Sequence, residues 1–291
     1  MNSQYNYNNF NFNCNFNFFR SWDKIPYAGE CRPPIGEEPF ASFWPLCFLK
    51  RNDDNLFTDS FGNIIPLDIK EPNMSFDFEG EVNFLYYTLN NLTCRQAKIA
   101  KYWSDGPPSK QFMPIADILI DTYGVSACRA NRIYYILNGA LNDSCIICWY
   151  LKYKWNIIRP NQYDRSFASF ICTPKHPSYP SGHSTFAACM AEILSYFFPA
   201  EKEKLDFLAE QCSYSRVYAG VHYRFDCDEG LKLGRSIAKA ILREVQYQSY
   251  LNRLQVDIPY TIFKDANIIP HTLEQYIPFA RDSKCSSLTL N

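Results

Sequence analysis

The chain has 291 residues, a length that fits one or two domains and allows a large buried core. Hydrophobic residues make up 47% of it and charged residues 20%, which excludes a disordered or fibrous protein. The 29 Lys and Arg nearly cancel the 30 Asp and Glu, so neither nucleic acid nor an anionic membrane surface is indicated as a partner. The sequence has no apolar run of about 18 residues that would span a bilayer, and its first residues lack the pattern of a signal peptide. These features predict a cytoplasmic protein.

The first 75 residues lack helical periodicity. Residues 1–20 are a tract of Asn, Phe and Tyr, a composition typical of sticky segments that are poorly ordered when alone. We therefore expect a flexible tail there, with the potential to associate with surfaces. Residues 21–75 contain seven prolines, which is typical of an irregular segment wrapped over a folded body.

Helical periodicity starts near residue 79. Helices are expected over residues 79–91, 93–103, 114–123, 126–157, 184–198, 200–214 and 227–248. Thr93 and Gln96 have the spacing of a capping box, and Gly124 is placed to end the third helix. Strand-like alternation is hardly present. The sequence therefore predicts an all-α helical bundle over residues 76–250, with a C-terminal extension, residues 251–291, packed on it.

Twelve cysteines are scattered along the chain, unlike the regular spacing of a small disulfide-rich domain. Cys145 and Cys148 lie one helical turn apart, which suits a redox or zinc pair, but no second Cys/His pair is suitably spaced. We interpret them as small core hydrophobes. Free thiols of this kind indicate a reducing compartment, although the sequence leaves the redox state of the twelve cysteines open.

Three stretches concentrate groups that bind an oxyanion, and the first lies at the end of the long helix. Lys152 and Arg159 are about two helical turns apart and can share a face. Pro160 disfavours helical φ and ψ at Arg159, so it ends the helix and frees the guanidinium to turn inward. Taken alone, a Lys and an Arg near a helix C-terminus are more typical of solvated partners of the helix dipole.

The second stretch runs from Pro177 to Ser184, directly before a helix, and contains Pro-Ser-Gly-His at residues 180–183. Gly182 lets the backbone approach a ligand, and the free N–H groups of a helix N-terminus bind anions. His183 could exchange a proton with a ligand held there. The alternative is an ordinary Ser181-Gly182 helix cap with an incidental histidine.

The third stretch runs from Ser215 to Asp226. His222 and Asp226 are four residues apart, close enough for the carboxylate to hold one ring nitrogen while the other faces a ligand. The alternative is a buried histidine satisfied by an aspartate. Considered together, Arg216, Lys152 and Arg159 supply three positive charges, about what a phosphate-like trianion needs away from water.

These stretches together read K-x6-RP, PSGH and SR-x5-H-x3-D, and in this order they resemble the signature of the superfamily that joins vanadium-dependent haloperoxidases and type 2 phosphatidic acid phosphatases. The resemblance covers about residues 79–248, whereas the segments before and after it match nothing in the family. It implies an oxyanion site made of Lys152, Arg159, Ser181, the Gly182 N–H and Arg216. It also implies that His222, supported by Asp226, is the vanadium ligand or the phosphorylated nucleophile, and that His183 is the acid–base group.

Three further residues resemble those at corresponding positions in the haloperoxidase branch. Asp105 lies in an aromatic-Asp-Gly segment whose aspartate pairs in those enzymes with the oxyanion-binding arginine, which implies an Asp105–Arg216 ion pair. Trp149 matches a pocket tryptophan, and His176 occupies a position that is His in bromoperoxidases and Phe in a chloroperoxidase. The alternatives are that Asp105 only forms a turn, that Trp149 is a core residue, and that His176 is an exposed loop residue.

The resemblance implies a haloperoxidase that uses vanadate and hydrogen peroxide to oxidise halide, bromide in preference to chloride. Phosphate would fit the same site, so the first alternative is a soluble acid phosphatase that hydrolyses phosphate monoesters through a phosphohistidine. The second alternative is a coat protein with a vestigial oxyanion site, which the intact motifs disfavour. Small-molecule substrates are expected, without nucleic acid or a membrane span, and homo-oligomerisation is left open.

Overall fold

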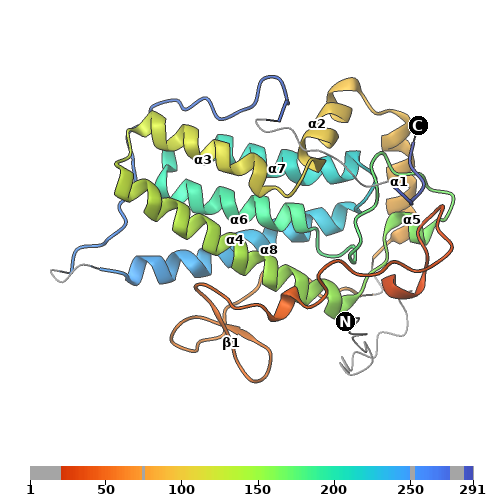
Figure 1. The fold of residues 1–291 in the computed structure, drawn as a ribbon, viewed down its shortest axis with the longest axis horizontal. Helices are drawn as coiled ribbons and strands as arrows, with labels where there is room; N and C mark the ends of the chain where they lie inside the picture. The colour runs from red at the N-terminus through yellow and green to blue at the C-terminus, as the bar shows by residue number, and fades with distance from the viewer. Residues whose placement is uncertain (1–20, 74–75, 250–252, 276–284, 291) are drawn as a thin grey trace, which may run out of the picture.

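A computed structural model describes residues 21–73, 76–249, 253–275 and 285–290 (Figure 1). The tail expected over residues 1–20 lies outside the described residues. The α-helices are α1 (Phe78–Asn90), α2 (Cys94–Ser104), α3 (Ser109–Tyr123), α4 (Ala127–Trp155), α5 (Pro160–Tyr163), α6 (Gly182–Phe197), α7 (Lys202–Tyr218) and α8 (Arg224–Tyr247). Short 3₁₀ turns are η2 (Trp22–Lys24), η3 (Ala41–Phe43) and η4 (Pro199–Glu201), and the strands are β1 (Lys50–Arg51) and β2 (Phe57–Thr58). The predicted all-α class is confirmed.

Helix α6 is the centre of the bundle. Thirteen of its 16 residues are buried, because α4, α7 and α8 pack around it (Figure 1). The sequence of α6 is correspondingly apolar on nearly every side, which is typical of a helix in the core of a domain. The N-terminus of this buried helix begins with the PSGH motif, so the core itself positions that motif.

Two glycines bring α8 close to the start of α6. A Cβ atom on Gly230 would lie 2.8 Å from the Ser181 carbonyl oxygen, and one on Gly234 would overlap the Thr185 carbonyl oxygen. Only glycine therefore allows this approach, and it carries the beginning of α8 to the first turn of α6. The third sequence stretch is thereby brought beside the second.

The helix boundaries agree with the sequence to within four residues, except at the start of α3. The Thr93 capping box is present, with the Gln96 N–H donating to the Thr93 hydroxyl at 3.2 Å, and Gly124 ends α3 with φ of 61°. Helix α3 begins at Ser109, five residues earlier than expected, because the Pro108 carbonyl accepts the N–H groups of two residues of its first turn; Pro114 is tolerated inside the helix. The short helix α5 was not expected.

The segment before α1 is fixed to α4 by one buried carboxylate. Asp143, in the middle of α4, accepts the backbone N–H groups of Cys47, Phe48 and Leu49 at 2.6, 2.9 and 3.0 Å. Gly139, one turn earlier, leaves room for the Phe48 ring. The irregular segment is thus held by a side chain that satisfies three consecutive backbone donors, which explains how a chain without regular structure packs on a helix.

A disulfide joins Cys172, in the loop before α6, to Cys285 near the C-terminus, with a Cα–Cα distance of 5.5 Å. The sequence leaves the redox state of these two residues open, and the bond is at odds with the reducing compartment that free thiols indicate. Cys145 and Cys148 are free; Cys148 is buried, and burial raises the pKa of its thiol, in keeping with the interpretation of a core residue.

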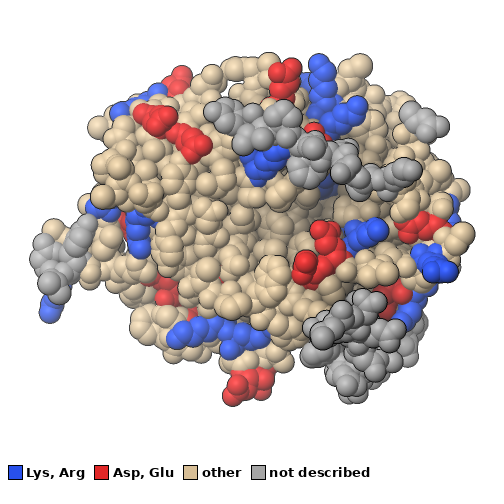
Figure 2. Space-filling model, viewed as in Figure 1, with Lys and Arg blue, Asp and Glu red and all other residues tan. Residues whose placement is uncertain are grey.

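The described surface agrees with the near-zero net charge. On the face shown in Figure 2, Lys and Arg alternate with Asp and Glu over a surface that is mostly uncharged. Among the described helices, none is both long and apolar enough to cross a membrane.

Candidate active site

The three sequence stretches meet at one end of the bundle. Lys152 comes from the last turn of α4, and Arg159 from the extended chain after it, where φ is −82° and ψ is 160°. The loop before α6 contributes His176, α7 contributes Arg216 from its last turn, and His222 precedes α8. Arg159 has the extended backbone expected before Pro160 and turns into the protein, but Pro160 does not end the long helix: α4 already ends at Trp155, where Asn156 adopts a left-handed conformation with φ of 53°.

The Lys152 ammonium is buried and bound by the loop before α6. Its Nζ atom donates to the carbonyl oxygens of Pro177 and Ser178 at 2.8 and 2.9 Å. Burial lowers the pKa of Lys152, and the positive charge of Arg159 acts in the same direction. An ammonium has three protons, so the third remains for a ligand in the site.

The Arg159 guanidinium is also buried and joins two histidines. Its Nε atom donates to the His176 carbonyl oxygen at 3.1 Å, and one terminal nitrogen donates to the Val221 carbonyl oxygen at 2.6 Å. The same terminal nitrogen lies 3.0 Å from His222 Nε2, and the other lies 3.0 Å from His176 Nδ1. Arg159 therefore contacts the predicted ligand histidine directly.

His222 is held by Asp226, as its spacing predicts. His222 Nδ1 lies 2.8 Å from Asp226 Oδ2, which also accepts the Ser178 hydroxyl at 2.5 Å and the Tyr223 N–H at 3.2 Å. Because an ionised carboxylate only accepts hydrogen bonds, Nδ1 carries the proton and Nε2 presents a lone pair, which accepts from Arg159. Burial raises the pKa of Asp226, while the Ser178 hydroxyl and the charge of Lys152 lower it.

Burial and nearby cations favour the neutral form of the site histidines. Burial lowers the pKa of His222, His183 and His176 well below the usual value, and nearby cations lower it further. These cations are Arg159 and Lys152 for His222, and Arg216 for His183. A bound anion would offset the cations and raise the same pKa values, so the histidines are ready to accept protons when an anion binds.

The first turn of α6 supplies backbone and hydroxyl donors. Ser181 caps the helix, and its hydroxyl accepts from the N–H and the hydroxyl of Ser184 at 3.3 and 2.8 Å, which leaves the Ser181 proton to donate. A Cβ on Gly182 would lie 3.5 Å from the Trp149 ring. His183 Nε2 lies 3.0 Å from the Trp103 carbonyl oxygen, so Nε2 carries its proton and Nδ1 is the nitrogen with the lone pair.

Arg216 is buried beside the end of α2. Its Nε atom donates to the Ser215 hydroxyl at 2.9 Å, and a terminal nitrogen donates to the Ala100 carbonyl at 3.2 Å and the Ser104 hydroxyl at 2.9 Å. Asp105 is half-buried and follows Ser104 directly as the C-cap of α2. The turn expected at residues 104–106 thus lies next to Arg216, and the Asp105–Arg216 ion pair stays a prediction.

Aromatic rings form one wall beside the cations. The Trp149 ring lies 4.9 Å from the His176 ring and 6.1 Å from the Phe186 ring, nearly parallel to the latter. Both Trp149 and His176 are half-buried. The alternatives of a plain core tryptophan and an exposed loop histidine therefore do not describe them, because His176 contacts both Trp149 and Arg159.

Sequence reasoning missed two contributors to the site. Ser178 lies within the second stretch, yet nothing in its spacing reveals that its carbonyl accepts from Lys152 while its hydroxyl donates to Asp226. Glu37, from the irregular N-terminal segment, accepts the Trp149 indole N–H at 3.3 Å through its carbonyl. A backbone acceptor carries no signal in the sequence, so this contact could not be found from it.

The chain is similar in sequence to known proteins. Residues 132–250 match the family model of the PAP2 superfamily. A vanadium-dependent bromoperoxidase from Ascophyllum nodosum is 29% identical over 101 residues, which cover 25% of this chain and 18% of that protein.

Two solved structures are similar in fold. A bacterial vanadium-dependent iodoperoxidase has a TM-score of 0.59 at 23% identity, over 78% of this chain and 60% of that one. The holo form of a bacterial vanadium-dependent chloroperoxidase has a TM-score of 0.55 at 12% identity, over 76% of this chain and 60% of that one. At these identities the similarity shows a shared fold.

Proposed function

The chain contains a PAP2 superfamily domain, and from that premise we propose that it is a vanadate-dependent haloperoxidase-like enzyme. The observation that carries the proposal is the environment of His222. Its Nδ1 is fixed by Asp226, and its Nε2 lone pair is directed at buried cations. An imidazole nitrogen fixed in this way is suited to bind a metal or to attack a phosphoryl group.

The donor groups fit an oxyanion such as vanadate. Lys152, Arg159 and Arg216 would bind its oxygens, with Ser181 and the Gly182 N–H at the positive end of α6, and His222 would hold the metal. Vanadate, when bound, supplies a Lewis acid that activates hydrogen peroxide. The cations hold the anion away from water, where each hydrogen bond to it is stronger than in solution.

His183 is the group proposed to move protons. Its Nε2 donates to the Trp103 carbonyl, so a proton would be taken up or released at Nδ1. Burial and the charge of Arg216 lower the pKa of His183, which favours the neutral ring that can act as a base. The bound anion would raise that pKa and let the same nitrogen release the proton again.

The wall made of Trp149, His176 and Phe186 is proposed to face the halide. A polarisable halide packs well against aromatic rings, and His176 could donate to it. His176, at a position that is His in bromoperoxidases and Phe in a chloroperoxidase, supports bromide over chloride as the substrate. The similarity to a bromoperoxidase supports the same choice.

A phosphatase is the second candidate, because the groups that would bind vanadate would also bind a phosphate ester. Phosphate and vanadate are both tetrahedral oxyanions, and the His222 Nε2 lone pair could attack a phosphate monoester as well as hold a metal. His183 would then protonate the leaving alcohol. A structural protein with a vestigial site has less support, because side chains from all three sequence stretches converge in the structure.

Two assays on one preparation separate the candidates. Protein supplied with vanadate is assayed for peroxide-dependent bromination, and phosphate is added as a competitor. The same preparation without vanadate is assayed for hydrolysis of p-nitrophenyl phosphate. We expect bromination that requires vanadate and is inhibited by phosphate. Rapid phosphate ester hydrolysis without bromination would support the phosphatase instead.

A further inference from the structure

We propose that the Cys172–Cys285 disulfide positions the oxyanion-binding residues, so that anion affinity depends on whether this bond is oxidised or reduced. The proposal rests on the oxyanion site described above, but it does not depend on which reaction that site catalyses. It concerns two segments. The acceptor loop is residues 172–178, and the strap is residues 285–290.

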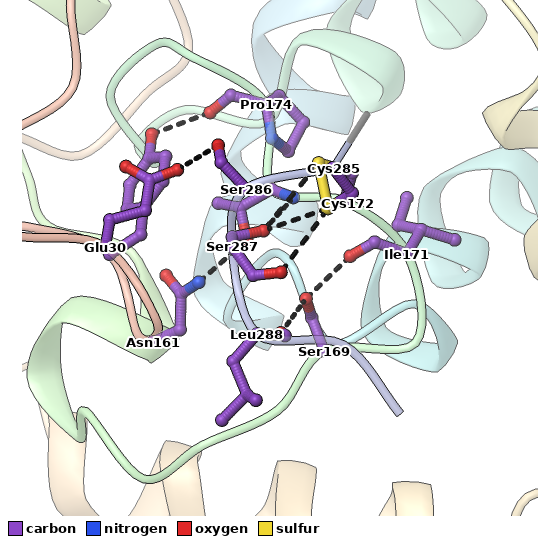
Figure 3. Close-up of a disulfide and its surroundings, with 12 residues drawn as sticks. Glu30, Asn161, Ser169, Ile171, Cys172, Pro174, Cys285, Ser286, Ser287 and Leu288 are labelled. Carbon is purple, nitrogen blue, oxygen red and sulfur yellow. Dashed lines mark hydrogen bonds between the residues drawn. A yellow bond between two sulfur atoms is a disulfide. The ribbon is translucent and has the colours of Figure 1, made fainter. Parts of the chain in front are cut away.

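The strap lies along the beginning of the acceptor loop (Figure 3). The disulfide joins the two segments, and the Thr173 N–H donates to the Ser287 hydroxyl at 3.1 Å. Just before the loop, Ser169 donates to the Leu288 carbonyl at 3.2 Å and accepts from the Leu290 N–H at 2.8 Å. The strap therefore fixes the backbone of residues 169–173 from one side.

The end of the acceptor loop contacts the cations. The Pro177 and Ser178 carbonyls accept from Lys152, and the carbonyl and ring of His176 contact Arg159. Ser178 also donates to Asp226. The carbonyl groups that accept hydrogen bonds from Lys152 and Arg159 thus begin at His176, four residues after Cys172. The loop that carries them has no helix or strand of its own. A shift at Cys172 would be passed to these carbonyls along a short length of chain.

On its other side, the strap is bound by residues before α1. The Leu288 N–H donates to the Ala28 carbonyl at 2.7 Å, and the Tyr27 hydroxyl donates to the Pro174 carbonyl at 2.7 Å. Gly29 has φ of +81°, and a Cβ there would lie 3.0 Å from the Leu288 nitrogen. The N-terminal segment therefore contacts the strap at Leu288 and the acceptor loop at Pro174, and the strap is held by a few hydrogen bonds and one covalent bond.

The covalent bond matters because the strap has no helix or strand of its own. A crosslink across 113 residues removes much of the conformational freedom of such a segment. Without the bond, the strap would be held by its backbone hydrogen bonds and by the hydroxyls of Ser286 and Ser287. We expect the acceptor loop to become mobile, and the carbonyls that orient Lys152 and Arg159 to become mobile with it.

The bond is accessible to a reductant, since both cysteines are exposed. A dithiol would attack one sulfur, form a mixed disulfide and close on itself. Two electrons and two protons pass to the protein, which gains two thiols, and the dithiol leaves as a cyclic disulfide. No other group in the site changes its covalent state.

The test measures inorganic phosphate binding by calorimetry, before and after treatment with dithiothreitol. We expect reduction to weaken phosphate binding about tenfold, the scale of one misplaced charged hydrogen bond. A Cys172→Ser, Cys285→Ser double variant should bind phosphate as weakly as the reduced protein and should not respond to dithiothreitol. Ser287→Ala, which keeps the disulfide but removes the hydroxyl that accepts from Thr173 and contacts both cysteine sulfurs, should weaken binding by a smaller factor.

A control variant separates positioning from a general loss of stability. Asp257→Asn removes the partner of Arg132, which is about 20 residues, or about 30 Å, from Lys152 along α4. It should lower the melting temperature and leave phosphate affinity unchanged. Equal phosphate affinity of the oxidised and reduced forms would overturn the positioning role. A fully oxidised protein that binds no phosphate would overturn the oxyanion site itself, and the proposal with it.

Discussion

The two ends of the helical bundle differ in how their buried charges are balanced. At the end where α4 begins and α6 finishes, charges of opposite sign are matched within the chain. Asp257 accepts from Arg132 at 2.7 Å, and Glu201 accepts from Lys204 at 2.9 Å and from the Ala266 N–H at 2.8 Å. At the other end, Lys152 and Arg159 donate to backbone carbonyls and a histidine.

The difference shows which buried charges stabilise the fold and which serve a ligand. A buried ion pair that is complete within the chain needs nothing more. At the site end, Lys152 and Arg159 lie near Asp226, while Arg216 lies beside the end of α2 next to Asp105, so three cations meet at most two carboxylates and positive charge remains in excess. Burying such an excess is costly unless an anion balances it. We therefore interpret the site end as an anion site and the opposite end as structural.

The largest effect is expected from removing His222. His222→Ala should abolish turnover in either of the two assays, because no imidazole would remain to hold vanadate or attack phosphate. Some phosphate binding should persist, since Lys152, Arg159 and Arg216 are intact. The matched control is His271→Ala, which removes an exposed histidine outside the site. Turnover close to the wild-type rate in His222→Ala would contradict the assigned role.

Replacing His183 should affect rate rather than binding. His183→Ala should slow turnover by about a hundredfold or more, the usual scale for loss of an acid–base group. Vanadate affinity should stay close to that of the wild type, because His183 is not among the groups proposed to hold the anion. The measurement is turnover at saturating vanadate together with a vanadate titration. An equal loss of vanadate affinity in His183→Ala and His222→Ala would show that the two roles are wrongly divided.

One pair of variants sharpens the comparison between the two ends. Lys152→Met should weaken phosphate binding by about ten- to a hundredfold with little change in the free energy of unfolding, because removal of a buried charge offsets the loss of its hydrogen bonds to the Pro177 and Ser178 carbonyls. Glu201→Gln should do the reverse, lowering the free energy of unfolding by about 1–3 kcal/mol without changing phosphate affinity. Denaturant unfolding and calorimetry provide both numbers. If both variants lowered the free energy of unfolding and neither changed phosphate affinity, the two ends would not differ as we infer.

The smallest effect is expected at Asp105. Asp105→Ala should weaken vanadate binding severalfold, because Arg216 would lose the carboxylate that orients its guanidinium. Charge alone predicts the opposite, since removing a negative group strengthens the attraction for an anion. The same change at the exposed Asp121 on α3 is the control. Tighter binding in Asp105→Ala would refute the predicted pair.

Whether a feature could be predicted from the sequence depends on how far apart in the chain the interacting residues lie. The helices, the Thr93 cap and the turn at Gly124 depend on neighbours a few residues away, and these were found with boundaries in error by up to five residues. The pairing of His222 with Asp226 was also found, because both lie within four residues at the start of one helix. Interactions between residues that are close in the chain can therefore be predicted from the sequence.

The contacts that were missed join segments far apart in the chain. Asp143 binds backbone N–H groups nearly a hundred residues earlier, and Ser178 meets Asp226 across the interface of α6 and α8. The disulfide could not be deduced either, because twelve cysteines allow many pairings and spacing alone does not choose among them. Such contacts depend on how the helices pack, which the periodicity of each helix does not specify.

A vanadate titration followed by vanadium-51 NMR tests the central claim most directly, namely that the surplus cations around His222 form an oxyanion site. The account predicts a saturable bound signal that phosphate displaces competitively and that Lys152→Met weakens, while Glu201→Gln leaves it unchanged. A signal that stays free throughout the titration, or bound vanadate that Glu201→Gln and Lys152→Met weaken equally, would contradict it.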